Sequence, residues 1–474
     1  MAQKPTIPQG TRDFSPLQVQ RRKFILNAIE QVFKKYGFMP LETPAIEYIS
    51  TLTGKYGDEG DQLVFKILNS GDYLKNLIEY NDKGLGHENL DKTFLPSLDG
   101  KLTNLDSKRT LPFIAEKGLR YDLTVPFARY VAMNRNEITF PFKRYQMQPV
   151  WRADRPQKGR YREFWQCDAD VIGSTSLINE AELLKVYDEC FSFLSIPVNI
   201  KINNRKILSA LAEIIQAKEK FTGITMAIDK LDKIGESGVR KELEKMGLDA
   251  DQVNTVLRFL ILSELSQPMP DLENLFKDSE EGMQGLKELK TVFSHLEILQ
   301  THNSVKLDVG LARGLTYYTG TIVEVQAKVG DYTASIGGGG RYDNLTGNFG
   351  LPDVSGVGIS FGLDRIYDVM EGLELFPKEI ISNDTKVLLC YFDEASQIYA
   401  LKICTQLRAA NIPAQIYPDI VKKIGKQLEY ANKLNISFAC IIGSKEMESG
   451  KPILKDLTLG TQEELTLEEL LHKF

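Results

Sequence analysis

The stretch FKRYQMQPVWRADRPQKGRYREFWQCDADVIG, residues 142–173, is typical of two strands joined by a loop. The loop is ADRPQKGR (153–160), where proline and glycine interrupt two runs rich in aromatic and β-branched residues. Side chains alternate between the two faces of a strand, so Gln166, Asp168 and Asp170 share one face. We therefore expect a β-hairpin with a face that carries an amide and two carboxylates.

The same hairpin holds the densest positive charge in the chain. From Lys143 to Arg162 it contains seven lysines or arginines and one aspartate. A solvated basic hairpin is the simplest explanation. Arg152, however, lies on an apolar and aromatic stretch, where a buried guanidinium needs an anionic partner. An arginine that suits a carboxylate or phosphate, next to carboxylates that suit a cation, indicates an amino-acid ligand, which carries both kinds of group.

A further strand is predicted in VSGVGISFGLDRI, residues 354–366. Alternation assigns its branched and aromatic residues to the core, while glycines, among them Gly358 and Gly362, leave the opposite face nearly bare. A bare strand face lets a flat ring lie close to the backbone, as at a nucleotide site. Arg365 follows where a helix should begin, so it could reach a phosphate near the amide-rich helix end. The alternative is that the glycines only permit tight sheet packing.

Two tyrosines precede an alternating β-branched run in LARGLTYYTGTIVEV. If 317–327 is a strand, the adjacent Tyr317 and Tyr318 point to opposite faces. Both can serve one site only if the chain bends just before the strand, which Gly314 permits. Arg313 would then stand at the mouth of that site. The alternative is that both are core tyrosines with satisfied hydroxyls.

The glycine run in SIGGGGRYDNLTG, Gly337 to Gly340, matches neither the dinucleotide-binding G-x-G-x-x-G pattern nor the P-loop pattern, which is absent from the chain. A dinucleotide fold and a P-loop are therefore disfavoured. The run is equally consistent with a flexible turn and with a loop that a ligand approaches.

The chain is expected to divide into two catalytic segments, a helical insertion between them and a terminal domain. A helix at 16–36 is followed by an extended segment, FMPLETPAIEYI, whose two prolines suit a sheet edge or an interface. Residues 79–110 are polar and turn-rich, which indicates a surface excursion of unassigned role. The expected boundaries are 1–204 and 303–378 for a catalytic domain in two parts, 205–302 for a helical insertion, and 384–474 for a terminal domain with alternating strands and helices.

Composition excludes several classes of protein. The five cysteines contain no C-x-x-C pair and the four histidines no metal-site spacing, so we expect buried free thiols and no metal held by protein side chains. A net charge of −6 argues against a generic basic coat for nucleic acid. No secretory leader or long apolar window is evident, so we expect no membrane segment and a cytoplasmic location.

Taken together, these segments resemble class II aminoacyl-tRNA synthetases, and most closely the histidyl-tRNA synthetase family. The segments that carry the resemblance are IPQGTRDFSP, helix 16–36 with ETPAIEY (motif 1), LRYDLTVPFARY, VWRADRPQKGRYREFWQCDAD (motif 2), LARGLTYYTGTIVEV, GGGGRYDNL and GVGISFGLDRI (motif 3). The resemblance implies an α+β catalytic domain on an antiparallel sheet with a helical insertion, and a C-terminal α/β anticodon-binding domain. It also implies a homodimer formed through the motif 1 region.

The implied reaction activates L-histidine with ATP, assisted by Mg²⁺, and then transfers histidine to the 3′ end of tRNA(His). By resemblance, Asp122 and Thr124 would hold the histidine ammonium group. The other histidine-binding residues would be Gln166, Asp170, Tyr317, Tyr318, Arg152 and Arg313. Because hydrogen bonds to a ring discriminate strongly against analogues that lack its N–H groups, no editing site is expected.

The resemblance assigns the phosphate chemistry to arginines. Arg152 and Arg313 would clamp the α-phosphate and the substrate carboxylate, and Arg365, with Arg160, would hold the terminal phosphates, so that Arg313, Arg152 and Arg365 are the catalytic residues. The ATP-binding set is Arg152, Arg160, Arg162, Arg365, Gly358 and Gly362. Gln157 and Lys158 would touch the tRNA acceptor stem. Thr316 departs from the family, which commonly has Asp or Asn there.

Two other classes of function remain. A catalytically silent, histidine-binding regulatory relative usually lacks the terminal domain and the phosphate-binding arginines, but Arg152, Arg313, Arg365 and 384–474 are all present. An RNA-binding protein without enzymatic activity leaves the bare strand and the row of carboxylates unexplained.

Overall fold

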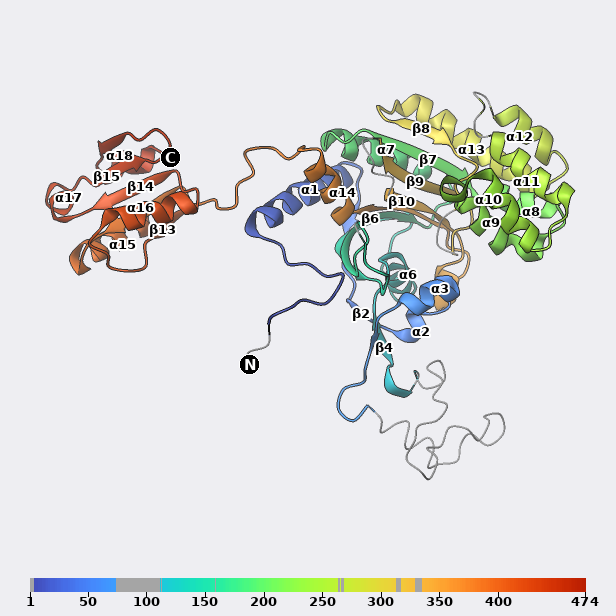
Figure 1. Ribbon diagram of the computed structural model, residues 1–474, viewed down its shortest axis with the longest axis horizontal. Helices are drawn as coiled ribbons and strands as arrows, with labels where there is room; N and C mark the ends of the chain where they lie inside the picture. Colours follow the sequence, from blue (N-terminus) through green and yellow to red (C-terminus); the bar gives the residue numbers. More distant parts are fainter. Residues whose placement is uncertain are drawn as a thin grey trace. The chain divides into compact units, whose positions relative to one another are not determined.

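The structure is a computed structural model, drawn as a ribbon in Figure 1. The residues that it describes are 4–73, 111, 113–157, 159–262, 265, 268–312, 317–328 and 335–474. The chain folds into two compact units. The first unit consists of Met1–Arg12 and Phe24–Leu375, and the second consists of Asp13–Lys23 and Phe376–Phe474. The predicted excursion at 79–110 lies outside the described residues.

The first unit is built on an eight-stranded sheet with the order β1-β5-β6-β11-β10-β9-β7-β8. Its strands are β1 Met39–Pro40, β5 Phe142–Trp151, β6 Glu163–Ile172, β7 Val198–Asn204, β8 Ser304–Leu307, β9 Thr321–Ala327, β10 Ser335–Tyr342 and β11 Gly356–Gly362. The interior pairs are antiparallel, and only the edge pairs β1–β5 and β7–β8 are parallel. The predicted antiparallel sheet and the predicted hairpin of β5 and β6 are thus confirmed.

Helices pack on one face of this sheet: α1 Pro16–Lys35, α7 Ile178–Phe193 and α14 Leu363–Gly372. Phe361 of β11 is fully buried and lies 5.8 Å from the Phe33 ring of α1 and 4.6 Å from the Tyr187 ring of α7, between ring centroids. Because side chains alternate along β11, Gly358, Ser360 and Gly362 face away from these helices. The bare strand face therefore lies on the side of the sheet opposite to α1 and α7.

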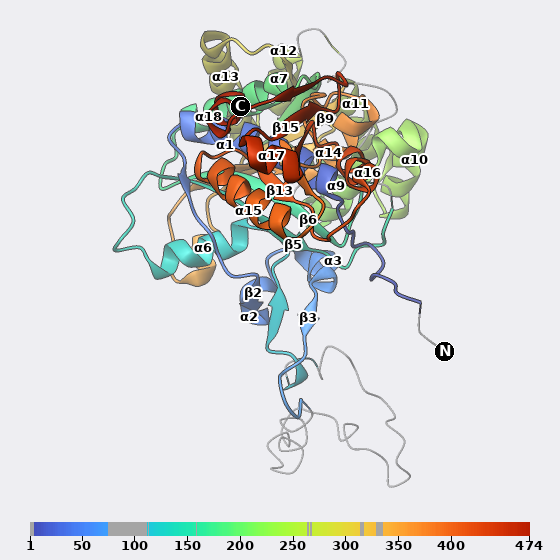
Figure 2. The ribbon, with the colours of Figure 1, turned by 90° about the vertical axis from the view of Figure 1, so that its left-hand side faces the viewer.

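A small sheet with the order β2-β4-β3 belongs to the same unit and lies below β5 and β6 of the large sheet in Figure 2. The elements of this region are β2 Ile46–Tyr48, α2 Ile49–Leu52, α3 Gly57–Leu63, β3 Lys66–Ile67, β4 Lys117–Leu119 and α6 Thr124–Met133. The predicted extended segment enters the large sheet as the edge strand β1, where Pro40 lacks the N–H that a central strand would need.

Between β7 and β8 the chain is helical. The elements are α8 Arg205–Ile214, η2 Lys218–Lys220, α9 Phe221–Asp229, α10 Leu231–Lys245, α11 Ala250–Leu262, α12 Met269–Phe276 and α13 Glu280–Leu299. Because β7 and β8 pair in parallel, their connection must cross over, and the helical segment is that connection. It begins at Asn204, whose side chain caps α8 by accepting a hydrogen bond from the Lys206 amide.

The second unit contains a five-stranded mixed sheet with the order β13-β12-β14-β15-β16, coloured orange to red in Figure 1. Its elements are β12 Val387–Tyr391, α15 Glu394–Ala409, β13 Ala414–Ile416, α16 Ile424–Lys433, β14 Phe438–Ile442, α17 Ser444–Ser449, β15 Ile453–Asp456, β16 Gln462–Glu464 and α18 Leu467–His472. The parallel pairs β12–β13 and β12–β14 have the predicted strand–helix–strand connections.

All five cysteines are buried and free, as predicted. Within the described part of the chain, no helix is long and apolar enough to cross a membrane. The same residues include no group of three or more histidine, cysteine, aspartate or glutamate side chains that could hold a metal ion.

Candidate active site

The carboxylate row of β6 and the bare face of β11 form one continuous surface. In the register of the sheet, Asp170 lies between Arg144 of β5 and Gly358 of β11, and Gln166 lies opposite Gly362. Two features that lie far apart in the sequence are therefore direct neighbours on the same face. Their alternation was predicted, but their shared register follows only from the pairing of β6 with β11.

Asp170 is held by a buried ion pair and a phenol. Its Oδ2 lies 2.8 Å from Nη2 of Arg144, and its Oδ1 accepts a 2.7 Å hydrogen bond from the Tyr342 hydroxyl. A Cβ atom at Gly358 would lie only 1.9 Å from the same Oδ1. The space beside Gly358 is therefore occupied by a carboxylate, whereas a Cβ at Gly362 would meet no atom closer than 3.6 Å.

Asp168, the next carboxylate of the row, is also buried. Burial raises the pKa of Asp168 to about 7, a shift that the positive charge of Arg144 opposes and the charge of Asp170 reinforces. Among the described residues, Asp168 Oδ1 and Gln166 Oε1 have no hydrogen-bond partner. Buried acceptors normally have one, so this face is suited to a ligand that donates hydrogen bonds.

A third carboxylate, Asp122, lies just before α6 and receives three hydrogen bonds. Its Oδ1 accepts from the Tyr56 hydroxyl at 3.0 Å and from the Val125 amide at 3.1 Å, and its Oδ2 accepts from the Tyr317 hydroxyl at 3.0 Å. Burial raises the pKa of Asp122, while these donors favour its charged form. Thr124, the first residue of α6, is half-buried beside it.

The tyrosine pair lies ahead of β9, which begins at Thr321, so the prediction of a strand from residue 317 is wrong at its start. Because they precede the strand, Tyr317 and Tyr318 are free of its alternation and contact each other, with ring centroids 5.0 Å apart. Tyr317 is also 6.1 Å from the Tyr342 ring. This contact joins the surroundings of Asp122 to those of Asp170.

We call this set of residues the acid–phenol cluster. Its members are Asp122, Asp168, Asp170, Tyr56, Tyr317, Tyr318 and Tyr342. Its three carboxylates are 2 % exposed. Arg144 is fully buried against it, and its guanidinium also donates to the Leu123 carbonyl at 3.3 Å. The excess of buried acid over buried cation favours a ligand with positive charge or several N–H donors.

Three arginines form a second group, the cation cluster, made of Arg152, Arg160 and Arg365. The Arg152 guanidinium lies over the Tyr121 ring, 4.3 Å from its centroid, and Arg365 donates to the carbonyls of Gly159 and Ser335 at 2.7 and 2.6 Å. Burial, together with the positive charges of Arg152 and Arg160, lowers the pKa of Arg365. Because these like charges repel one another, an anion bound between them would be stabilised.

Only one member of the cation cluster forms an ion pair within the described part of the chain: Arg160 lies 2.8 Å from Asp154. Arg365 stands in the first turn of α14, as predicted for a residue at a helix start. Nε of Arg152 donates a 3.1 Å hydrogen bond to the carbonyl of Tyr121, the residue before Asp122, so the cation cluster and the acid–phenol cluster adjoin.

The other residues predicted in or beside the motif 2 loop are Arg162, Gln157 and Lys158. Arg162 donates to the backbone carbonyls of Asp154 and Gln9 at 3.1 and 3.4 Å, so its guanidinium braces the motif 2 loop. Gln157 is exposed and pairs with Arg160 through backbone hydrogen bonds. Lys158 lies outside the described residues. So do Arg313, Gly314 and Thr316, and the predictions for them remain predictions.

Three buried members of the site were missed from the sequence: Tyr56, Arg144 and Tyr342. Arg144 could have been found, because alternation places it on the same face as Gln146 in the predicted hairpin. Tyr342 was hidden because the preceding glycine run was interpreted as a loop. That interpretation is wrong, since Gly337 to Gly340 lie within β10 and the absent side chains leave room for aromatic rings.

Comparisons with known proteins identify relatives of the whole chain. A family model described as histidyl-tRNA synthetase matches residues 86–366, and one described as anticodon binding domain matches residues 381–474. The chain is 50% identical over 472 residues to the histidine–tRNA ligase of Bacteroides fragilis (strain YCH46), covering 99% of each chain. It is 51% identical over 468 residues to the histidine–tRNA ligase of Christiangramia forsetii, covering 98% of each. The crystal structure of histidyl-tRNA synthetase from Nostoc sp. PCC 7120 superimposes with a TM-score of 0.75 at 29% identity, covering 100% of both chains.

Proposed function

The chain belongs to the histidyl-tRNA synthetase family, and from this premise we propose that the acid–phenol cluster and the cation cluster are the two halves of its active site. The protein is an aminoacyl-tRNA ligase that joins histidine to tRNA with the consumption of ATP. The observation that supports this division is chemical: unpartnered buried acceptors and carboxylates lie on one side, and on the other lie three arginines of which only Arg160 has an ion-pair partner among the described residues.

Histidine is assigned to the acid–phenol cluster. Asp122, with Thr124, would bind the ammonium group, because three hydrogen-bond donors favour the charged form of this carboxylate. The imidazole would be surrounded by Gln166, Asp170, Tyr317 and Tyr318. The unpartnered Gln166 Oε1 can accept from a ring N–H, and an amino acid without that donor would leave it unsatisfied, which is the physical basis of selection.

ATP is assigned to the cation cluster. In activation, a carboxylate oxygen of histidine attacks the α-phosphorus and pyrophosphate leaves, so negative charge grows on the phosphate oxygens. Arg152, and Arg313 by its place in the family pattern, would stabilise the α-phosphate, and Arg365 with Arg160 the terminal phosphates. Gly362 leaves open strand face for the flat base. Arg162 would act by shaping the loop that carries Arg160.

Mg²⁺ is proposed as the partner of the phosphates. Such an ion keeps several waters and is bound largely by substrate phosphates, so it needs few protein ligands. Bound there, it would neutralise phosphate charge during transfer.

The second step transfers histidine to the 3′ end of tRNA(His). We assign the acceptor stem to the motif 2 loop, with Gln157 and Lys158, and the anticodon to residues 384–474. We propose that the catalytic domain consists of residues 1–204 and 303–378, with a helical insertion at 205–302 between them. We also propose that the protein forms a homodimer through the motif 1 region and is located in the cytoplasm.

The test is ATP–pyrophosphate exchange by the purified chain, measured with each of the twenty amino acids in turn. Exchange is expected with histidine alone, followed by charging of tRNA(His). Exchange that depends on another amino acid would refute the assignment of the acid–phenol cluster. A protein that binds histidine without any exchange would instead be a regulatory relative.

A further inference from the structure

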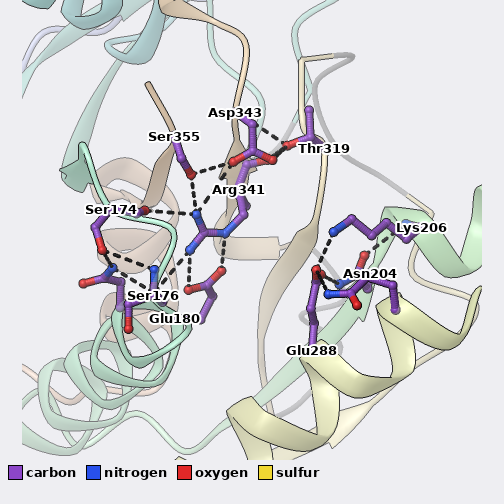
Figure 3. A network of polar contacts seen from close by, with 12 residues as sticks. Ser174, Ser176, Glu180, Asn204, Lys206, Glu288, Thr319, Arg341, Asp343 and Ser355 are labelled. Carbon is purple, nitrogen blue, oxygen red and sulfur yellow. Dashed lines mark hydrogen bonds and ion pairs between the residues drawn. The ribbon is translucent and has the colours of Figure 1, made fainter. Parts of the chain in front are cut away.

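Thr319, the residue after the tyrosine pair, is tied to the end of β10 (Figure 3). Its amide donates to the Arg341 carbonyl at 2.8 Å, and its hydroxyl donates to Oδ2 of Asp343 at 2.5 Å. The Asp343 amide donates back to the Thr319 hydroxyl oxygen at 3.1 Å. A single threonine therefore bonds to one short segment through both its backbone and its side chain, and its hydroxyl also lies 3.4 Å from the Arg341 carbonyl.

The far side of this segment is anchored to α7. Arg341 is 5 % exposed, and its Nε and Nη2 donate to the two carboxylate oxygens of Glu180 at 2.6 and 2.8 Å. Ser355 links the two groups, since it accepts from the Arg341 guanidinium and donates to Asp343, as Figure 3 shows. A bidentate pair of this kind fixes orientation as well as distance.

The anchored segment carries the site on its other face. Tyr342, between Arg341 and Asp343, donates to Asp170. A Cβ at Gly340 would lie 2.9 Å from the Tyr318 ring, so that ring rests directly on the β10 backbone. The residues that hold Thr319 are thus interleaved with residues that touch the acid–phenol cluster.

Residues 317–320 need such support because they lie beyond the strand ladder. The pairing of β9 begins at Thr321, opposite Asn204, and no ladder bond orients the tyrosines themselves. Their geometry therefore depends on local contacts, of which those of Thr319 are the nearest. The following residue is fixed too, because the Arg205 amide donates to the Gly320 carbonyl at 2.8 Å.

We propose that Thr319 and Asp343, anchored by Arg341, are positioning residues for histidine recognition. This inference rests on the proposed function of the acid–phenol cluster. The two residues act through Tyr317, Tyr318 and Tyr342 and not by contact with either substrate. Displacement of a binding group by about 1 Å can cost roughly a hundredfold in rate. Loss of the Thr319–Asp343 hydrogen bond, which holds the neighbouring tyrosines in place, should therefore weaken histidine recognition.

The test compares Thr319→Val, which removes the hydroxyl and keeps the shape, with Thr319→Ser, which keeps the hydroxyl. In pyrophosphate exchange, Thr319→Val should raise the KM for histidine by roughly tenfold or more, because a hydrogen bond to a charged carboxylate is lost, with the KM for ATP unchanged within about twofold. Thr319→Ser should restore most of the loss. Thr321→Val is the matched control, since among the described residues the Thr321 hydroxyl has no hydrogen-bond partner.

Asp343→Ala removes the other end of the same bond. The double variant of Thr319→Val with Asp343→Ala should therefore show little more loss than the larger single effect. An unchanged histidine KM in Thr319→Val, or equal increases in both KM values, would overturn the inference, as would equal effects of the valine and serine variants. Absence of histidine-dependent exchange in the unmodified chain would instead refute the proposed function.

Discussion

Replacement of Gly358 by alanine tests the central contact of the site. The new Cβ would lie 1.9 Å from Oδ1 of Asp170, whereas real Cβ contacts essentially never fall below 3.0 Å. The Asp170 carboxylate is held between Arg144 and Tyr342, so it cannot move without loss of these partners. We therefore expect the carboxylate to rotate out of the acid–phenol cluster.

The size of the effect follows from the bond that is lost. A hydrogen bond to a charged group contributes about 1.5–3 kcal/mol. If Asp170 gives up only the bond from Tyr342, histidine activation should fall by roughly 10- to 150-fold, because about 1.4 kcal/mol corresponds to a factor of ten. Loss of the Arg144 pair as well would increase this figure.

The assay is histidine-dependent pyrophosphate exchange, with KM measured separately for histidine and ATP. Gly358→Ala should raise the KM for histidine or lower kcat/KM for it. Gly362→Ala, on the same strand face but clear of Asp170, should act on the KM for ATP instead, because a methyl group there would stand under the proposed base. Gly347→Ala, whose nearest neighbour would be 3.7 Å away, serves as the control for a glycine outside the site.

A Gly358→Ala variant that binds histidine as well as the unmodified chain does, within about threefold, would refute the expected displacement of Asp170. That result would mean that Asp170 can move away at no cost to recognition. A similar loss in Gly358→Ala and Gly347→Ala would show that any added methyl group harms the protein, and the specific contact would lose its support.

Three further predictions concern charge. Arg144→Met leaves Asp170 buried without its ion pair and should destabilise the protein by about 3–5 kcal/mol, seen as a lower thermal midpoint, and a loss below about 1 kcal/mol would contradict this. Burial raises the pKa of Asp168 to about 7, so the native state binds its proton more tightly than the unfolded state and stability falls as pH rises from about 4 to about 7. Asp168→Asn should lack that fall, and parallel curves of midpoint against pH would refute it. Arg313→Ala should reduce adenylate formation far more than histidine binding. Equal losses of the two would show that Arg313 does not specifically stabilise the transition state.

Features with a local cause were predictable. The hairpin of β5 and β6, the helix α1 and the strand–helix alternation of the terminal unit follow from side-chain period, end signals and turn residues, which act within a few positions of one another. The polar face of Gln166, Asp168 and Asp170 was found for the same reason. The boundary of β9 was not, because the β-branched run does not show where ladder pairing stops.

The amino-acid sequence by itself determined which residues share a strand face, where the helices begin, and which charges are available to a ligand, because these depend on neighbours along the chain. Tertiary folding was needed to bring Tyr56 to Asp122, to place Asp170 beside Gly358 and to make the glycine run a strand. Those outcomes depend on the register between distant strands and on which side chain fills a given space. Neither quantity exists until the sheet has formed, so no pattern within one segment could predict them.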